Sequence, residues 1–258
     1  MATMSVCMTR VCSPFHDLVN TSYTKAMIRL HVEAPLASGT AIEATESQVH
    51  YLGGVMRRAA GDAVHLFNGR DGEWTGRIAS LSRHKATFAV ETLIRPQCAE
   101  TDLWLAFAVL KRNATDLVVQ KATELGVSAL LPVFTERTNA GRINLDRLRT
   151  IAIEAAEQSE RLTVPGIHPV RKLHDFLTSW PAGRSLFVAL ERANAPPLTP
   201  MTGPSGLLIG PEGGFGPHDQ MLLDQWSLVR PVSLGPRILR ADTAAIVGLA
   251  LLQAPRCG

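Results

Sequence analysis

The sequence predicts an α/β protein in which a small β-rich domain precedes a larger domain, a parallel sheet with helices on both faces. Three observations support this prediction. After residue 101, short apolar runs alternate with helical stretches, a pattern typical of parallel sheets. Before residue 95, the sequence contains short strand candidates, turn signals and one helix candidate. Near the end, two glycine-rich turns each follow an apolar run and open into a helical stretch.

The β-rich domain is expected over residues 27–95. Segment 1–26 lacks the apolar core of a secretory signal, and we expect it to be a disordered extension or the product of an upstream start codon. The motif NGRDG directly after Phe67 is a strong turn signal. We expect one helix at Glu46–Arg58, and strands at Ile28–Val32, Ala63–Phe67, Trp74–Ala79 and Ala86–Leu93.

The sequence pattern changes at Ile94–Thr101, from short strand and turn signals to apolar runs that alternate with helical stretches. This segment is the expected linker to the larger domain, which is expected over residues 101–258. Leu103–Val109 is a continuous apolar run, which suits a buried parallel strand. Asn113 and Asp242 are expected to cap helices, and Gly126 to end one. Further strands are expected at Ala129–Phe134, Ser185–Leu190, Leu207–Ile209 and Val229–Leu234, and helices at Asn113–Leu125, Asp146–Arg161, Pro217–Trp226 and Asp242–Gln253.

Composition narrows the class of protein. With 258 residues, of which 46% are apolar, the chain can bury a core in one or two domains. The net charge of +3 permits a nucleic-acid partner without requiring one. No apolar run reaches the ~20 residues of a membrane span. The four cysteines form neither a CxxC pair nor a zinc-type cluster, so we expect no metal, no disulfide framework and a reducing, cytoplasmic location.

The two glycine turns are LLIGPEGGFGP at Leu207–Pro217 and SLGPRILRADTA at Ser233–Ala244. Neither matches the phosphate-binding fingerprints GxxxxGK[ST] or GxGxxG. In a parallel sheet both turns lie at the carboxyl ends of the strands, where two backbone loops can form one ligand pocket. Arg237 and Arg240 beside the second turn suit an anionic substrate such as RNA phosphate. The alternative is that the turns are ordinary loops and the arginines are solvated or paired with Glu212 and Asp242.

With these residues in view, the chain resembles the SPOUT superfamily of S-adenosylmethionine-dependent RNA methyltransferases. It is more closely similar to the family that methylates uridine N3 in 16S ribosomal RNA. The segments Val55–Trp74, Gln120–Thr138 and Ile151–Pro165 carry the same resemblance. The family commonly has Glu where this chain has Asp242, which shortens the reach of that carboxylate toward a substrate.

The resemblance implies a fold that the pattern alone does not supply. A SPOUT methyltransferase domain over residues 101–258 would contain a deep C-terminal trefoil knot that includes both glycine turns. Residues 27–95 would form a PUA-like β-barrel RNA-binding domain. The resemblance also implies a homodimer, with 16S ribosomal RNA of the small ribosomal subunit as the partner.

The implied cofactor is S-adenosyl-L-methionine, held largely by backbone groups of the two turns. The resemblance places it against the end of one strand and against both turns. The expected contacts are Leu190, Gly210, Pro211, Glu212, Gly213, Gly214, Leu234, Gly235, Arg237 and Leu239.

Three residues are candidates for catalysis. Uridine N3 carries a proton that must leave before the nitrogen can attack, and a positioned base typically contributes ~10²–10⁴-fold. Glu212 and Asp242 are candidate bases, and both could be purely structural. A guanidinium at Arg240 would stabilise the deprotonated imide beside the uracil carbonyls. Its alternative role is an ion pair between subunits.

Basic residues in both domains are candidate RNA contacts, acting together as one surface that grips a structured RNA. Each one alone is equally explained as a solvated surface charge. They are Arg57, Arg58, Lys111, Arg112, Arg137 and Arg161. Two other functions stay open from the sequence: a SPOUT methyltransferase with another target, such as a ribose 2′-hydroxyl, and a non-catalytic ribosome-assembly factor that keeps the fold.

Overall fold

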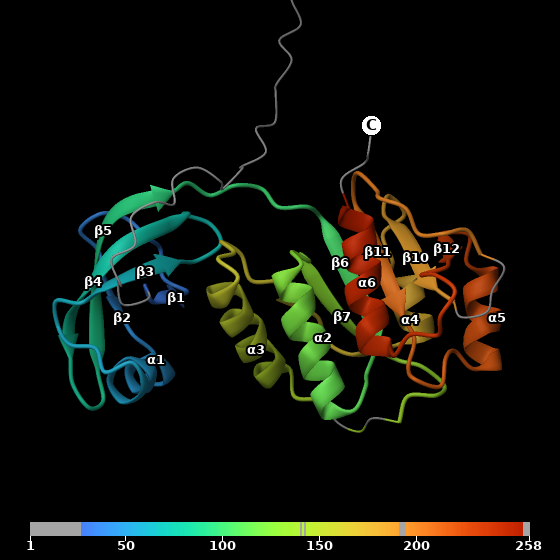
Figure 1. Cartoon of the computed structure of the whole chain (residues 1–258), viewed down its shortest axis with the longest axis horizontal. Coiled ribbons are helices and arrows are strands. Elements are labelled where there is room, and N and C mark those ends of the chain that lie inside the picture. The colour runs from blue at the N-terminus through green and yellow to red at the C-terminus, as the bar shows by residue number, and fades with distance from the viewer. Residues whose placement is uncertain (1–26, 140, 142, 191–194, 255–258) are drawn as a thin grey trace, which may run out of the picture.

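The structure is a computed structural model that describes residues 27–139, 141, 143–190 and 195–254, so the expected extension 1–26 lies outside the described residues. Two sheets lie side by side along the long axis of the molecule, joined by an extended connection after β5 (Figure 1). Strands near the N-terminus build one sheet, and strands from residue 103 onward build the other.

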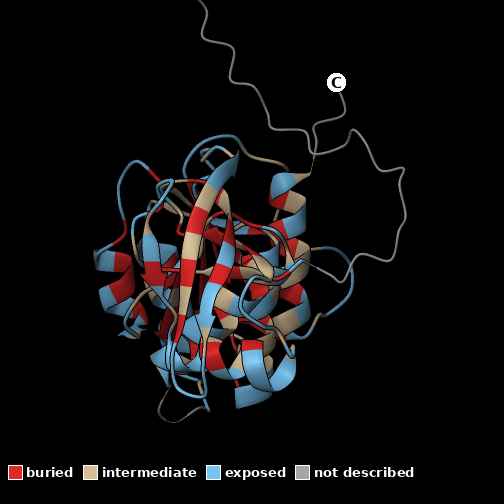
Figure 2. Ribbon diagram, turned by 90° about the vertical axis from the view of Figure 1, so that its left-hand side faces the viewer, coloured by how far each residue is buried: buried red, intermediate tan, exposed pale blue. Residues whose placement is uncertain are grey.

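The first sheet has five strands in the order β1-β3-β4-β5-β2, so that β1 and β2 are its two ends. β1 pairs in parallel with β3, and the other pairings are antiparallel. Buried and partly buried positions alternate along the first half of β5, and the strands of this sheet face the viewer in Figure 2. The strands are β1 (Arg29–His31), β2 (Ala41–Glu43), β3 (Ala63–Phe67), β4 (Glu73–Leu81) and β5 (Ala86–Arg95).

The predicted helix of this domain is shorter than expected. Thr45 caps α1 (Glu46–His50) through a capping box with Gln48, but the α-helix ends after His50. A π-helical turn, Tyr51–Val55, follows and contains two consecutive glycines. Glycine is a poor helix former, and this accounts for the early end of α1. The sequence pattern also missed β2, whose three residues are too few to show an alternation.

The second sheet has seven strands, all parallel, and its longest path is β12-β10-β11-β6-β7-β8, with β9 also pairing with β7. Its strands are β6 (Leu103–Ala108), β7 (Ala129–Phe134), β8 (Gly166–Ile167), β9 (Arg171–Lys172), β10 (Ser185–Ala189), β11 (Ser205–Ile209) and β12 (Val229–Val232). The helices are α2 (Arg112–Glu124), α3 (Leu145–Gln158), α4 (Leu173–Thr178), α5 (Pro217–Gln225) and α6 (Ala241–Gln253). The parallel sheet of the prediction is confirmed.

Helices cover both faces of the second sheet, as predicted. Side chains of α2, α3 and α6 pack with Leu105 and Leu207 in one core cluster. Side chains of α4 and α5 pack with Ala106 and Leu208 in another cluster. Successive residues of a strand point to opposite faces, so β6 and β11 each contribute to both clusters. In Figure 1, α2 and α6 lie over the near face of this sheet.

The two predicted helix caps were wrong, whereas the predicted stop was right. Lys111, not Asn113, precedes α2, and Thr115 bonds to the backbone N–H and C=O of Leu110 instead. Asp242 is the second residue of α6, and its Oδ1 accepts from the backbone N–H of Thr243. Gly126 follows the end of α2 with φ +80°, a conformation that favours glycine. The short elements β8, β9 and α4 carried too little pattern to be expected.

Arg29 on β1 joins the first sheet to α3 of the second domain. Its Nε donates to Glu73 at 2.5 Å, and its two terminal nitrogens donate to the carbonyls of Ala156, Glu157 and Arg161 at 2.9–3.0 Å. These carbonyls lie at or just past the C-terminal end of α3, where a cation is favoured by the helix dipole. None of the helices in the described part of the chain combines the length and apolar character that crossing a bilayer requires.

Glu157 lies at the same junction. Its Oε1 accepts from the backbone N–H of His31 at 2.9 Å. Burial raises the pKa of Glu157 from its ordinary value of 4.5 to about 7, although the His31 bond and the charge of Arg29 act to lower it. The contact between β1 and α3 therefore includes a carboxyl group whose pKa is about 7.

In the wild type, Glu157 makes the free energy of unfolding fall as pH rises, and Glu157→Gln is expected to abolish this contribution. Between pH 4.5 and about 7 the folded chain holds more protons at Glu157 than the unfolded chain, so this residue's contribution to the free energy of unfolding falls with rising pH. His31, His65 and His168 have lowered pKa values and act in the opposite sense, so the difference between variant and wild type is the informative quantity. In urea unfolding, the free energy of unfolding of the variant minus that of the wild type should rise with pH up to about pH 7. A difference that does not depend on pH would contradict this.

Candidate functional site

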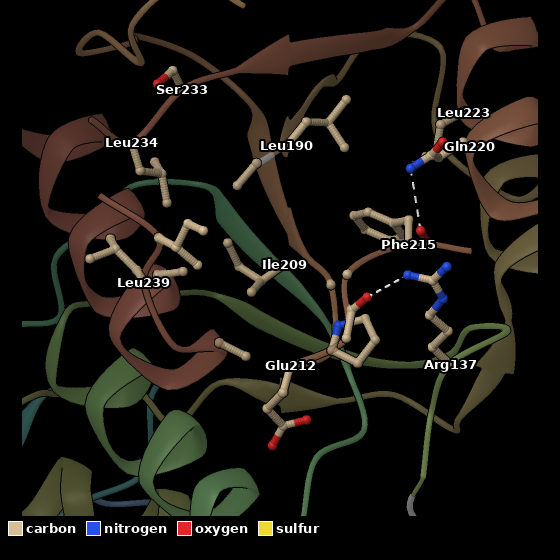
Figure 3. Close-up of a pocket in the computed structure, with 18 of the residues that line it drawn as sticks. Arg137, Leu190, Ile209, Glu212, Phe215, Gln220, Leu223, Ser233, Leu234 and Leu239 are labelled. Atoms are coloured by element: carbon tan, nitrogen blue, oxygen red, sulfur yellow. Dashed lines mark hydrogen bonds between the residues drawn. The ribbon is translucent and has the colours of Figure 1, made fainter. Parts of the chain in front are cut away.

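A cavity of about 780 Å³ opens at the carboxyl edge of the second sheet, between the two glycine turns. The ends of β10 and β11 form its floor, and the segments 209–215 and 233–239 form two of its walls (Figure 3). Its size lies within the range of small-molecule sites, roughly 300–1,000 Å³. The expectation that two backbone loops build one pocket is confirmed by this placement.

The first turn is a tight backbone loop. The N–H of Gly214 donates to the carbonyl of Pro211 at 2.9 Å, and Gly214 has φ +67°. A side chain at Gly210 would place its Cβ 3.0 Å from the ring of Phe215, which is buried beneath the turn. Glycine at these two positions lets the backbone approach the cavity closely.

The second turn is held by its own backbone and by the connection between β10 and β11. Gly235 has φ +121°, a region essentially restricted to glycine, and its N–H donates to the Ser233 hydroxyl at 3.2 Å. Ser233 also pairs with the connecting segment: its N–H donates to Pro196 and its carbonyl accepts from Leu198. The turn is therefore fixed from two sides.

The cavity combines apolar side chains with exposed backbone. Leu190, Ile209, Phe215, Leu234 and Leu239 surround it in Figure 3. A flat apolar ring can pack between such side chains, while glycine backbone supplies hydrogen-bonding groups. The described residues hold no group of three or more His, Cys, Asp or Glu that could bind a metal ion.

Comparisons with known proteins identify the domain that carries this cavity. A family model described as an RNA methyltransferase domain matches residues 97–253. The chain belongs to the RNA methyltransferase family. A second model, an RNA methyltransferase PUA domain, matches residues 44–91, which lie in the first sheet domain.

Individual relatives agree with the family models. Ribosomal RNA small subunit methyltransferase E of Rickettsia conorii is 31% identical over 233 residues, 87% of this chain and 94% of the relative. The crystal structure of the enzyme of that name from Neisseria gonorrhoeae, bound to S-adenosyl methionine, matches with a TM-score of 0.78 at 27% identity over 87% of this chain and 95% of that one. A Legionella pneumophila structure in complex with the bound cofactor SAM matches with a TM-score of 0.80 at 29% identity, covering 88% and 97% of the two chains.

In this methyltransferase domain, all the residues expected to contact a cofactor line the one cavity: Leu190, Gly210, Pro211, Glu212, Gly213, Gly214, Leu234, Gly235, Arg237 and Leu239. The cavity is also lined by residues that the sequence did not indicate, among them Ser233, Gln220 and Asp224. Ser233 is the first residue of the second glycine turn, and this position was the one signal that could have found it. The two residues of α5 carried no comparable signal.

The three catalytic candidates lie differently around the cavity. Arg240 is exposed at the N-cap position of α6, one residue before Ala241, which lines the cavity. Asp242 follows in the first turn of α6 with one carboxylate oxygen bonded to Thr243. Glu212 lines the cavity, but Figure 3 shows its carboxylate pointing away from Leu190 and Leu234.

Two of the six expected RNA contacts need correction. The guanidinium of Arg161 is 7% exposed and bonds to Glu100 and to the carbonyls of Thr123 and Val127, so it holds the methyltransferase domain together rather than facing RNA. The side chain of Arg58 is equally buried and forms an ion pair with Asp62. A run of charged letters in the sequence does not distinguish such internal arginines from surface ones.

The other four expected RNA contacts are exposed. Arg57, with φ +49°, lies in the PUA domain. Lys111 and Arg112 follow β6, and Arg137 follows β7, so these three lie at the carboxyl edge of the sheet that also bears the cavity. Arg137 additionally lines the cavity and donates to the carbonyl of Gly213 at 2.7 Å.

Arg161→Ala is expected to lower the free energy of unfolding by about 3–5 kcal/mol, because it leaves Glu100 without its ion-pair partner and removes a donor from the carbonyls of Thr123 and Val127. Arg112→Ala, an exposed arginine of the same domain, is the matched control and should change it by less than ~0.5 kcal/mol. Urea unfolding measures both. Equal, small effects would return Arg161 to the candidate RNA contacts.

Proposed function

We propose that this chain is an S-adenosylmethionine-dependent methyltransferase that modifies N3 of a specific uridine in 16S ribosomal RNA of the small subunit. The observation that carries the proposal is the cavity between the two glycine turns, in a chain that belongs to the RNA methyltransferase family. The name of the Rickettsia relative supports small-subunit ribosomal RNA as the substrate, and the molecule bound in the Neisseria structure supports S-adenosylmethionine as the cofactor.

The lining of the cavity fits S-adenosylmethionine. Leu190, Leu234 and Leu239 offer an apolar slot for the adenine ring, and the Gly210–Gly214 turn offers close backbone contact to polar groups. When bound, this cofactor supplies a methyl group on a positively charged sulfur. The fixed turns hold their ligand in one orientation. Such positioning can account for a large part of the reduction in the activation barrier of methyl transfer.

The acceptor atom, N3 of uridine, must be deprotonated, and residues of this chain are placed to assist. The negative charge that results spreads onto the two uracil carbonyls. Arg240, beside the cavity and exposed, is placed to stabilise that charge or to hold the nucleotide phosphate. Asp242 and Glu212 stay the candidate proton acceptors, Asp242 through its carboxylate oxygen that is not bonded to Thr243.

Basic residues at the carboxyl edge of the second sheet suit an RNA backbone. Four of them follow the ends of strands: Lys111, Arg112, Arg137 and Arg237. The fifth, Arg240, directly precedes α6. Arg57 adds a positive charge on the first sheet domain. Residues 27–95 would act as a PUA-like, barrel-type RNA-binding domain and residues 101–258 as the SPOUT methyltransferase domain, which together grip a folded RNA by its phosphates.

The proposal includes the trefoil knot and the homodimer of the SPOUT superfamily. In support of the knot, segment 196–201 forms backbone hydrogen bonds with both Ser233 and Leu252, so it lies beside the second turn and the end of α6. The exposed Ile238 beside the cavity suits a subunit interface. The proposal also assigns the enzyme to the cytoplasm, which fits a ribosomal RNA substrate.

Small ribosomal subunits lacking the modification are expected to accept a methyl group from S-adenosylmethionine, with 3-methyluridine as the product nucleoside by mass spectrometry. Arg240→Ala should lower kcat by about 10²-fold, because it removes a group that stabilises the developing charge. Arg230→Ala, an exposed arginine on β12 outside the cavity lining, is the control. Another methylated nucleoside would contradict the proposed target, and full activity of Arg240→Ala would contradict the role of Arg240.

Gly235→Ala should weaken S-adenosylmethionine binding about tenfold, the equivalent of about 1.4 kcal/mol, because φ +121° is strained for alanine and the turn must shift. Gly61→Ala is the matched control: Gly61 also has a positive φ, +93°, and also has open space where a Cβ would lie, but it belongs to the other domain. Both variants should lose stability, and calorimetric titration should show weaker binding only for Gly235→Ala. Equal affinities would contradict the assignment of this turn to the cofactor.

A further inference from the structure

The loop that follows β7, Thr135–Thr138, lies against the first glycine turn although it is far from that turn in sequence. Arg137 donates to the carbonyl of Gly213 at 2.7 Å. The backbone N–H of Glu136 donates to Asp219 at 2.9 Å. The loop itself is a closed turn, since the N–H of Thr138 donates to the carbonyl of Thr135 and that of Thr135 to the Thr138 hydroxyl.

Glu136 supplies a helix cap that α5 lacks. The N-cap residue of α5 is Gly216, which has no side chain to accept from the first turn. Oε2 of Glu136 accepts instead from the backbone N–H of His218 at 3.1 Å. A Cβ at Gly216 would lie 2.0 Å from that oxygen and 3.0 Å from the Glu136 Cβ, so glycine at this position leaves the room that Glu136 occupies.

Asp219 completes the arrangement from the other side. It is 3% exposed, and its Oδ2 accepts both from Gly216 in its own helix turn, at 3.3 Å, and from Glu136. Each of the two acidic residues therefore accepts from the backbone of the other's segment. A carboxylate at a helix N-terminus is also favoured by the helix dipole.

We propose that Glu136 is a positioning residue for the cofactor: with Asp219 it latches the end of β7 to the start of α5 and so fixes the Gly210–Gly214 turn in its ligand-ready form. This inference rests on the proposed function, because it assigns the turn to S-adenosylmethionine. Glu136 acts through the turn, and the cavity lining does not include it. Without the latch, only a fraction of molecules hold the ready turn, and the apparent dissociation constant rises by the inverse of that fraction.

Calorimetric titration with S-adenosylmethionine, in the absence of RNA, tests the latch on the full chain. Glu136→Ala should raise Kd about fivefold, the equivalent of the ~1 kcal/mol of a helix cap. Glu136→Gln keeps an acceptor oxygen and should stay within about twofold of wild type. Glu91→Ala, which removes an exposed glutamate paired with Arg77 in the other domain, is the control and should leave Kd unchanged.

Two further measurements separate positioning from general stability. Hydrogen exchange of the ligand-free chain should show lost protection at the amides of Gly214, Gly216 and His218 in Glu136→Ala but not in Glu136→Gln. In steady state, KM for S-adenosylmethionine should rise in Glu136→Ala while KM for RNA stays constant. Unchanged Kd in Glu136→Ala, or equal Kd values for the Ala and Gln variants, overturns the latch. A wild type that binds no S-adenosylmethionine overturns the proposed function, and the role of Glu136 toward the cofactor with it.

Discussion

The close approach of α6 and Trp180 to β11 from opposite faces is the constraint on which the methyltransferase domain depends. All five residues of β11 are buried, and two glycines allow the contact. A Cβ at Gly248 of α6 would lie 2.5 Å from Leu207, and a Cβ at Gly206 would lie 2.3 Å from Trp180. The position of β11 determines where the first glycine turn begins, because that turn directly follows the strand. The position of α6 determines where the second turn ends, because that turn leads into the helix. The cavity is therefore defined by the packing of the sheet's centre, not by the loops alone.

The junction between the domains works by a different principle. Glu73, with 4% of its side chain exposed, lies between Arg29 at 2.5 Å and Arg95 at 2.6 Å. Arg29 also covers the ring of Phe67, with its guanidinium carbon 4.6 Å from the ring centroid. Phe67 in turn packs against Ala156 and Leu162 of the methyltransferase domain. A charge network over a small apolar contact gives the junction a defined geometry.

The sequence could predict a feature where a residue type at that position has only one plausible structural role. Glycine after an apolar run marked both turns, because few other residues accept a φ such as the +121° of Gly235. The caps at Asn113 and Asp242 were misplaced, because several neighbouring polar residues can serve the same helix end. Arg161 was misread, because an arginine paired inside the protein and one on its surface look alike in sequence. The latch of Glu136 joins residues 82 positions apart, from Glu136 to His218, and no local pattern signals such a contact.

The position of α6 in the sequence has a consequence for the order of folding. This helix follows every strand of the parallel sheet, yet it covers β6 and β11 near the centre and packs on α2. During synthesis on the ribosome, the face that receives α6 stays open to water until the helix has emerged. The PUA domain, whose strands are all made earlier, can fold first as the chain is synthesised, whereas the cavity between the two glycine turns is completed only after α6 has been translated.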